Sequence, residues 1–245
     1  MAGRTDGMVT APLNKAAFSA AGFAYPGHTE LLGAICGASE VGMMLYLARG
    51  ERVPGRVGLG VVHVTLHTAL RNVFSQLSTE AIVSKGRLVD RIVRALLAES
   101  VDSSPPQIAV CALNPHAGEQ GLFGDEEKEI IQPAVEQLRS QGISVEGPLP
   151  VDTLMASAAQ GRFDAVVAMY HDQGHIALKL LDMYRAVNIT LGLPIVRTSV
   201  AHGTAFDLAW QGKAKSSGIV EAVSTAAQLV QRRNLWLEPH DSFIS

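Results

Sequence analysis

The chain has 245 residues, of which 47% are apolar and 18% are charged. This composition supports a sizeable packed core and excludes a disordered or fibrous chain. The formal net charge is only −3 and the basic residues are scattered, so we expect no nucleic-acid-binding surface and a small-molecule partner instead.

We predict neither a targeting segment nor a membrane span. The first residues lack the apolar core of a signal peptide, and no stretch reaches the roughly 18 unbroken apolar residues of a membrane helix. Cys36 and Cys111 lie in apolar surroundings without a Cys-x-x-Cys spacing, which indicates core thiols in a reducing compartment. We therefore expect a cytoplasmic protein.

Apolar runs rich in β-branched residues alternate with helical patterns along the chain. This alternation predicts an α/β fold with a parallel-rich sheet flanked by helices. No Gly-x-Gly-x-x-Gly fingerprint is present, so residues that bind a nucleotide cofactor are not assigned. In chain order, the expected strands cover residues 41–46, 57–65, 107–113, 143–146, 164–169, 186–191 and 195–199.

The helical segments are marked by caps and by apolar stripes of helical period. Thr29 is the expected N-cap of the first helix, and Pro133 should kink or divide the third. In chain order, the expected helices lie after Gly27-His28-Thr29-Glu30, at 86–98, at 125–142, after His202-Gly203-Thr204-Ala205 and at 219–230.

Three histidines, His67, His116 and His171, each follow an apolar run where it gives way to a polar loop. Strand ends of this kind carry the ligand-binding side chains of many α/β proteins. Three neutral imidazoles suit a divalent ion such as zinc, cobalt or manganese and leave open positions for substrate. His63 competes with His67, but it lies inside a predicted strand, so His67 is the preferred ligand.

A second group of polar residues predicts an anion site. His28 and Thr29 stand at a helix start, where backbone N–H groups and the helix dipole favour a phosphate. Lys179, Asn188 and Arg197 lie in or beside apolar segments, where a polar side chain needs a partner. Capping, snorkelling or a structural ion pair would explain each of them singly. Together they are the expected substrate-binding set.

The order of these motifs resembles the 4-hydroxythreonine-4-phosphate dehydrogenase (PdxA) family from about residue 8 to residue 231. The segments that carry the resemblance are Thr10-Ala11-Pro12 with Lys15, Gly27-His28-Thr29-Glu30, His67 with Leu70-Arg71, Asn114-Pro115-His116-Ala117-Gly118-Glu119, Gly147-Pro148-Leu149-Pro150 with Asp152-Thr153, Tyr170-His171-Asp172-Gln173-Gly174, Asn188-Ile189-Thr190-Leu191-Gly192-Leu193-Pro194, and Arg197-Thr198-Ser199 with His202-Gly203-Thr204-Ala205.

The resemblance implies a fold similar to isocitrate and isopropylmalate dehydrogenases and an oxidation that depends on NAD, with NADP as a possible substitute. His67, His116 and His171 would carry the divalent metal, which is zinc, cobalt, magnesium or manganese. The substrate would contact His28, Thr29, Lys179, Asn188 and Arg197. Lys179 and Asp172 are the candidates for proton transfer. The family forms homodimers with an active site shared between subunits.

The chain departs from the family pattern in two places. Family members are longer at the N-terminus, so the resemblance implies that the N-terminal part of a first domain is lacking. Residues 1–205 would then form the metal- and substrate-binding α/β domain, and residues 206–245 a C-terminal helical segment of the incomplete domain. Ala201 stands where enzymes of the pyridoxine pathway usually carry Asp, which resembles the branch that oxidises 4-phosphorylated threonate or erythronate.

We therefore expect a metal-dependent, NAD-linked oxidation, with decarboxylation, of a 4-phosphorylated hydroxy acid such as 4-phosphohydroxy-L-threonine, in pyridoxal phosphate biosynthesis or a related pathway. 4-Phospho-D-threonate or erythronate is the alternative substrate. A metal-dependent hydrolase and a catalytically inactive, metal-binding truncated module are the alternatives of another class. Formation of NADH from a phosphorylated hydroxy acid, without hydrolysis of esters, separates the dehydrogenase from the hydrolase, whereas the inactive module would bind metal without turnover.

Overall fold

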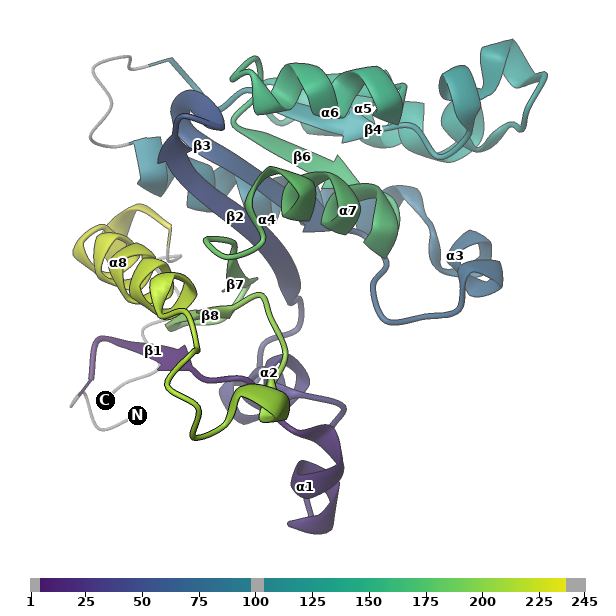
Figure 1. The fold of residues 1–245 in the computed structure, drawn as a ribbon. Coiled ribbons are helices and arrows are strands. Elements are labelled where there is room, and N and C mark those ends of the chain that lie inside the picture. Colours follow the sequence, from purple (N-terminus) through teal and green to yellow (C-terminus); the bar gives the residue numbers. More distant parts are fainter. Residues whose placement is uncertain (1–4, 98–103, 237–245) are drawn as a thin grey trace.

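The computed structural model describes residues 5–97 and 104–236. Its centre is an eight-stranded sheet with the strand order β1-β8-β7-β2-β3-β6-β4-β5 (Figure 1). In chain order the strands are β1 (Gly7–Thr10), β2 (Gly42–Gly50), β3 (Val53–His63), β4 (Ile108–Cys111), β5 (Val145–Leu149), β6 (Ala165–Ala168), β7 (Val187–Leu191) and β8 (Val196–Val200).

The sheet is mixed, with four parallel pairings and three antiparallel ones. β3, β6, β4 and β5 run parallel to one another, as do β1 and β8. β2 pairs antiparallel with β3 and with β7, and β7 pairs antiparallel with β8. The predicted α/β class and the parallel-rich character of the sheet are thus confirmed, while the antiparallel centre was not expected.

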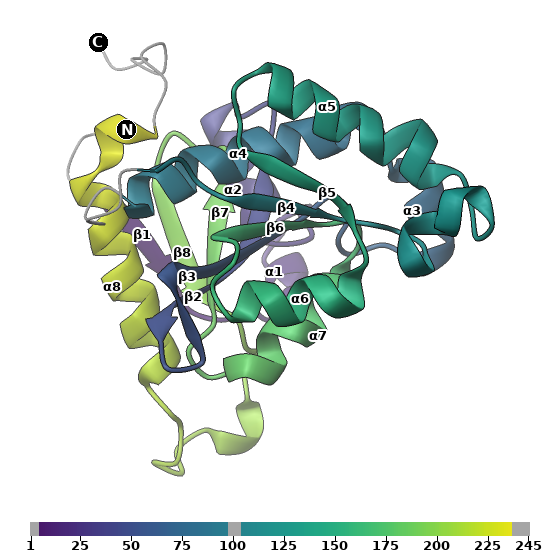
Figure 2. The ribbon, with the colours of Figure 1, turned by 90° about the horizontal axis from the view of Figure 1, so that it is seen from above.

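Helices cover both faces of the parallel half of the sheet. α4 and α5 lie on one face, and α6 and α7 lie on the other (Figure 2). α8 packs against β8, β1 and β7. The α-helices are α1 (Lys15–Ala20), α2 (His28–Cys36), α3 (Leu70–Gln76), α4 (Thr79–Leu97), α5 (Gln132–Ser140), α6 (Val151–Ala159), α7 (His171–Asp182) and α8 (Ser217–Gln231). In the part of the chain that the structure describes, no helix has the length and apolarity that crossing a membrane requires.

α4 begins at Thr79, seven residues or about two turns before the predicted start at residue 86. Gly86 lies inside the helix, where an added Cβ would come within 2.6 Å of Leu138 Cδ1 on α5. The glycine therefore permits the close approach of α4 and α5, and this packing overrides its poor helix propensity. The prediction at this boundary was wrong, and its last residue, Ala98, lies outside the described residues.

The other helix predictions divide into confirmed and wrong ones. Pro133 does divide its segment, since a π-helical turn (Glu127–Ile131) precedes it and α5 has the proline in its first turn. The segment after His202 forms only one 3₁₀ turn, Phe206–Leu208, instead of a helix. Thr29 is not an N-cap, because α2 already begins at His28 and its N-cap is Gly27 without a side-chain bond.

The first strand, β1, was not predicted. It is short and half-exposed, and it pairs with β8 in register from Gly7↔Val196 to Thr10↔Ser199. Such a strand has little apolar alternation of its own, and its stability depends on tertiary pairing. The expected division of the chain at residues 205 and 206 stays a prediction.

A buried carboxylate links three segments at the amino ends of the parallel strands. The Asp164 side chain, 3% exposed, accepts hydrogen bonds from the Arg56 guanidinium and, at 2.8 Å, from the Gln107 backbone N–H. Asp164 directly precedes β6, Arg56 belongs to β3, and Gln107 directly precedes β4. The pair therefore holds the starts of the three strands together at the edge opposite to their carboxyl ends.

We expect Asp164→Ala to lower the free energy of unfolding by about 3 kcal/mol, because it leaves the Gln107 backbone N–H without its acceptor and removes the carboxylate that pairs with a partly buried guanidinium. Urea denaturation followed by circular dichroism measures this change. The matched control is Glu146→Ala, which removes an exposed carboxylate from Arg162 and should change the free energy by less than about 1 kcal/mol. Equal effects of the two substitutions would contradict a structural role for the Asp164 pair.

Candidate functional site

The carboxyl ends of β3, β6 and β4 meet at one edge of the sheet. His63 of β3 is in register with Ala168 of β6, and Val110 of β4 with Val167. Two further backbone bonds, Val64 N–H to Ala168 O and Thr65 N–H to Met169 O, continue the β3–β6 pairing to the loops. Since parallel strands end at a common edge, the segments that carry the predicted metal ligands leave the sheet side by side.

His67 and His171 are brought together at this edge. Their ring centroids lie 5.9 Å apart. Burial, with further contributions from Lys15 and His171, lowers the pKa of His67, so its imidazole is neutral at pH 7. Asp172 Oδ1 lies 2.7 Å from Nδ1 of the half-exposed His171. A neutral imidazole next to a carboxylate-supported one is a donor set that fits a divalent metal.

His116 does not join this pair. Among residues 5–97 and 104–236, no group of three His, Cys, Asp or Glu side chains is placed to hold a metal. The predicted trio is therefore not assembled within one chain. Instead, His116 lines a neighbouring cavity of about 680 Å³ together with Tyr170 and Asp172.

The backbone around His116 has an unusual left-handed turn. Residues 116–120 all have positive φ, between 43° and 78°. Glu127, 6% exposed, supports the approach to this turn by accepting hydrogen bonds from the backbone N–H groups of Leu113 (2.8 Å) and Asn114 (2.7 Å) and from Asn114 Nδ2 (3.0 Å). The buried carboxylate thus fixes the segment that presents His116.

Three cavities adjoin along this edge and share residues. The cavity of about 680 Å³ shares Tyr170 and Asp172 with one of about 430 Å³, which His67 and His171 also line. His67 is shared in turn with a cavity of about 330 Å³ that Thr29 also lines. We call the three together the strand-end groove. It connects a predicted substrate residue, Thr29, to all three predicted metal ligands.

Arg197 is a buried cation whose hydrogen bonds go to hydroxyl groups. Its side chain is on β8 and the residue is 4% exposed. Nη1 donates to Thr190 Oγ1 at 3.0 Å, Nη2 donates to Thr10 Oγ1 at 2.6 Å, and Nε has no hydrogen-bond partner among the described residues. Burial lowers the pKa of Arg197 to about 10, which still leaves it charged at pH 7. A buried guanidinium in this state has capacity left for an anion.

The remaining predicted substrate residues are His28, Asn188 and Lys179. Burial lowers the pKa of His28, and the charge of Arg197 lowers it further, so the two side chains are electrostatically coupled. Asn188 on β7 has a buried Oδ1 without a partner among the described residues. Lys179 is half-buried on α7, and its charge contributes to lowering the pKa of His175.

The structure also shows residues in the groove that the sequence analysis did not select. Lys15, Glu30 and Lys85 line its cavity of about 330 Å³. Lys85 donates to Val41 O at 2.7 Å, and its burial lowers its pKa. Lys15 and Glu30 were named only as part of the segments that carry the family resemblance, and Lys85 had no signal of its own in the sequence. His63 and His175, whose nitrogens Nε2 and Nδ1 lie 3.1 Å apart, were also not selected.

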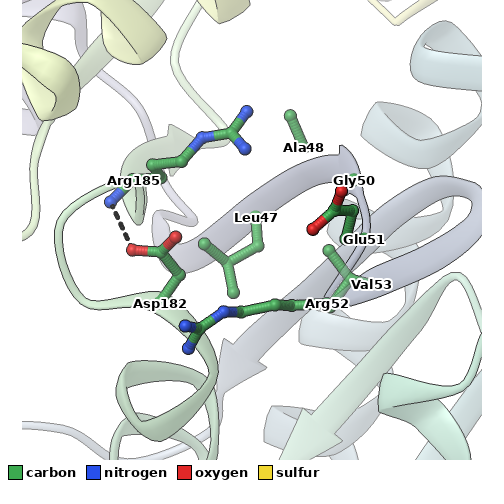
Figure 3. Close-up of a pocket in the computed structure, with 8 residues that line it drawn as sticks. All are labelled: Leu47, Ala48, Gly50, Glu51, Arg52, Val53, Asp182 and Arg185. Atoms are coloured by element: carbon green, nitrogen blue, oxygen red, sulfur yellow. Dashed lines mark hydrogen bonds between the residues drawn. The ribbon is translucent and has the colours of Figure 1, made fainter.

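A cavity of about 380 Å³ lies elsewhere, at the turn between β2 and β3 (Figure 3). Three of its four charged residues, Arg52, Asp182 and Arg185, already have partners. Arg185 pairs with Glu221, Arg52 donates to Leu181 O, and Asp182 accepts the backbone N–H groups of Tyr184 and Arg185. We therefore place the functional site in the strand-end groove and not in this cavity.

The fold and the groove define an α/β protein with a ligand site at the carboxyl ends of its strands. Residues 1–226 match the family model described as pyridoxal phosphate biosynthetic protein PdxA. The D-threonate 4-phosphate dehydrogenase of Pectobacterium atrosepticum is 47% identical over 94% of this chain and 66% of its own length. The 4-hydroxythreonine-4-phosphate dehydrogenase of Caulobacter vibrioides is 44% identical over 96% of this chain and 68% of its own length.

A solved structure agrees with these relatives. The crystal structure of a 4-hydroxythreonine-4-phosphate dehydrogenase from Klebsiella pneumoniae superposes with a TM-score of 0.76 at 47% identity, covering 91% of this chain and 63% of that one. The chain belongs to the PdxA family, as its motifs predict. It spans about two thirds of the length of the curated relatives that it matches.

Proposed function

We propose that this chain carries the metal and substrate site of an NAD-linked dehydrogenase for a 4-phosphorylated four-carbon hydroxy acid. The observation that carries the proposal is the strand-end groove, in which His67 lines one cavity with His171 and another with Thr29 and Glu30, and the charge of Glu30 acts on the buried Arg197. A ligand that is both a metal chelator and an anion matches this arrangement. We also infer that the fold of this chain is related to the fold of isocitrate and isopropylmalate dehydrogenases.

Residues of the groove and of the neighbouring strands and helices would each bind a different group of the substrate. Arg197 and His28 would receive an anionic group, and Asn188 Oδ1 would accept from a substrate hydroxyl or amine. A divalent metal held by imidazoles would lower the pKa of the substrate alcohol. Oxidation transfers a hydride from the carbinol carbon to the nicotinamide and releases the hydroxyl proton.

Decarboxylation follows from the chemistry of the oxidised product. With a carboxylate β to the new ketone, the bond between the carboxyl carbon and the α-carbon would break, carbon dioxide would leave with the electron pair remaining as an enolate, and the α-carbon of the enolate would take up a proton. We assign this proton transfer to Lys179, which lies two turns from His171 on the same side of α7. Asp172, the second candidate, is already occupied by His171 Nδ1 at 2.7 Å and is assigned to orienting that ring.

The names of the relatives bear on the substrate. The Pectobacterium relative is named for D-threonate 4-phosphate and the Caulobacter relative for 4-hydroxythreonine 4-phosphate, at similar identities. Ala201 favours the threonate substrate by the resemblance described above. We propose 4-phosphothreonate or 4-phosphohydroxythreonine as the substrate class.

The separation of His116 from the pair of imidazoles supports a site shared between two copies. We infer a homodimer in which His116 of one copy completes the site formed by His67 and His171 of the other. The exposed apolar side chains of α7, Ile176 (56% exposed) and Leu180 (78% exposed), border the cavity that His116 lines and would be covered by such a contact.

Metal-loaded protein should form NADH from NAD and one of the two phosphorylated substrates, as measured by absorbance at the nicotinamide band.

Arg197→Met should raise the KM for the phosphorylated substrate by at least about tenfold, because it removes a charge-assisted contact. The control is Arg185→Met, which removes a guanidinium paired with Glu221 away from the groove. A folded, metal-loaded sample that forms no NADH with either substrate contradicts the dehydrogenase proposal.

His67→Ala should abolish zinc binding, whereas His63→Ala should still bind zinc at saturating concentration. The physical reason is that His67 is exposed beside His171, whereas His63, which also lines the groove, is only 1% exposed and its Nε2 is engaged by His175 Nδ1. Zinc content after dialysis, measured by atomic absorption, tests both variants. The reverse result would show that the groove uses the other histidine.

Co-refolding His67→Ala chains with His116→Ala chains should restore metal binding that each variant lacks alone. In a shared site, each mixed dimer keeps one intact set of ligands, so random pairing restores about a quarter of the sites. Zinc content and NADH formation of the mixture both measure the restoration. If mixing restores neither, the ligands come from one chain and the shared-site proposal fails.

A further inference from the structure

Three imidazoles stand in a row from the sheet to the groove. His63, 1% exposed, ends β3, and His175, 7% exposed, lies on α7. Their ring centroids are 4.6 Å apart. The third imidazole is the half-exposed His171, whose centroid lies 3.7 Å from that of His175, with only 10° between the ring planes.

The hydrogen bonds of His175 give the row a direction. Its Nδ1 lies 3.1 Å from His63 Nε2 and 3.2 Å from the His171 backbone oxygen. A carbonyl oxygen can only accept, so the proton belongs on His175 Nδ1, which leaves His63 Nε2 as an acceptor. The ring of His175 is thereby tied both to the strand and to the first turn of its own helix.

The ring of His171 is restrained on two sides. The parallel stack with His175 fixes one face of the ring, and Asp172 Oδ1 contacts Nδ1 at 2.7 Å. These contacts leave Nε2 as the nitrogen that a metal would use. Ligand imidazoles in proteins are commonly oriented in this way by groups that do not touch the metal.

Gly174 makes room for the row. An added Cβ at this position would lie 2.5 Å from His63 Nε2 and 2.5 Å from Val61 Cγ1. The first turn of α7 can therefore approach β3 closely enough for the bond between His63 and His175. Any larger residue would displace the imidazole of His63 or lift the start of the helix that carries His171.

We propose that His63 and His175 are positioning residues that hold the His171 ring in the orientation used by the groove. His63 is fixed on strand β3, its contact with Nδ1 of His175 holds the ring of His175, and the ring stack between His175 and His171 holds the ring of His171. This inference rests on the proposed metal site. Two other roles are testable outcomes: His175 could itself be a ligand, or the pair could serve core packing alone.

Cobalt binding tests the proposal, because Co²⁺ reports both affinity and ligand geometry through its visible absorption. The probe is Co²⁺ titrated into the metal-free chain in competition with a chromophoric chelator. His63→Leu and His175→Leu should each weaken binding about tenfold and alter the visible spectrum. His175→Phe, which keeps a flat ring for the stack, should weaken binding less than His175→Leu.

A destabilised control separates positioning from packing. Val93→Ala removes methyl groups from a buried residue of α4 and should lower the melting temperature without changing cobalt affinity or spectrum. If the His63 and His175 variants lower the melting temperature but leave the affinity and spectrum as in Val93→Ala, the pair serves packing only and the proposal is overturned. Loss of binding in His175→Leu as complete as in His171→Ala would make His175 a ligand, which also overturns it.

Cobalt binding by the unsubstituted chain and by His171→Ala distinguishes failure of the proposed metal site from failure of the positioning role. If it binds no cobalt, or if His171→Ala binds cobalt as well as the unsubstituted chain does, the proposed metal site itself fails. If binding is lost in His171→Ala but unaffected in both leucine variants, the metal site stands and only the positioning role fails.

Discussion

The parallel alignment of β3, β6 and β4 is the constraint on which the candidate site depends. The register of these strands brings the loops after His63, Ala168 and Cys111 to one edge, although they are separated by many residues in the sequence. The Asp164 carboxylate holds the opposite ends of the same strands. A shift of one residue in this pairing would move each side chain to the opposite face of the sheet and separate the imidazoles.

Much of the fold follows from local sequence patterns. All seven predicted strands exist. Their apolar, β-branched runs mark them as buried strands, and helices or neighbouring elements cover them in the structure. The patterns were insufficient where tertiary contact decides. Gly86 lies within α4 because Leu138 leaves no room for a side chain, and β1 depends on its pairing with β8 and its packing against α8. The N-cap assigned to Thr29 failed because Gly27 already turns the chain.

Less of the site than of the fold could be predicted from the sequence. The loop positions of His67 and His171 predicted their proximity, and motif order identified the family. The separation of His116 depends on the path of a left-handed turn, and the row from His63 to His171 depends on a glycine that admits an imidazole. Neither arrangement has a periodic signature, because each arises from contacts between elements far apart in the chain.

The left-handed turn at residues 116–120 combines an energetic cost with a conformational benefit. Four of its five residues are not glycine, and each such residue in this conformation costs roughly 1–2 kcal/mol relative to the right-handed form. Glycine at these positions would remove that cost, but it would also widen the range of conformations open to the loop. The side chains of the turn therefore lower the stability of the fold and at the same time restrict the loop that presents His116.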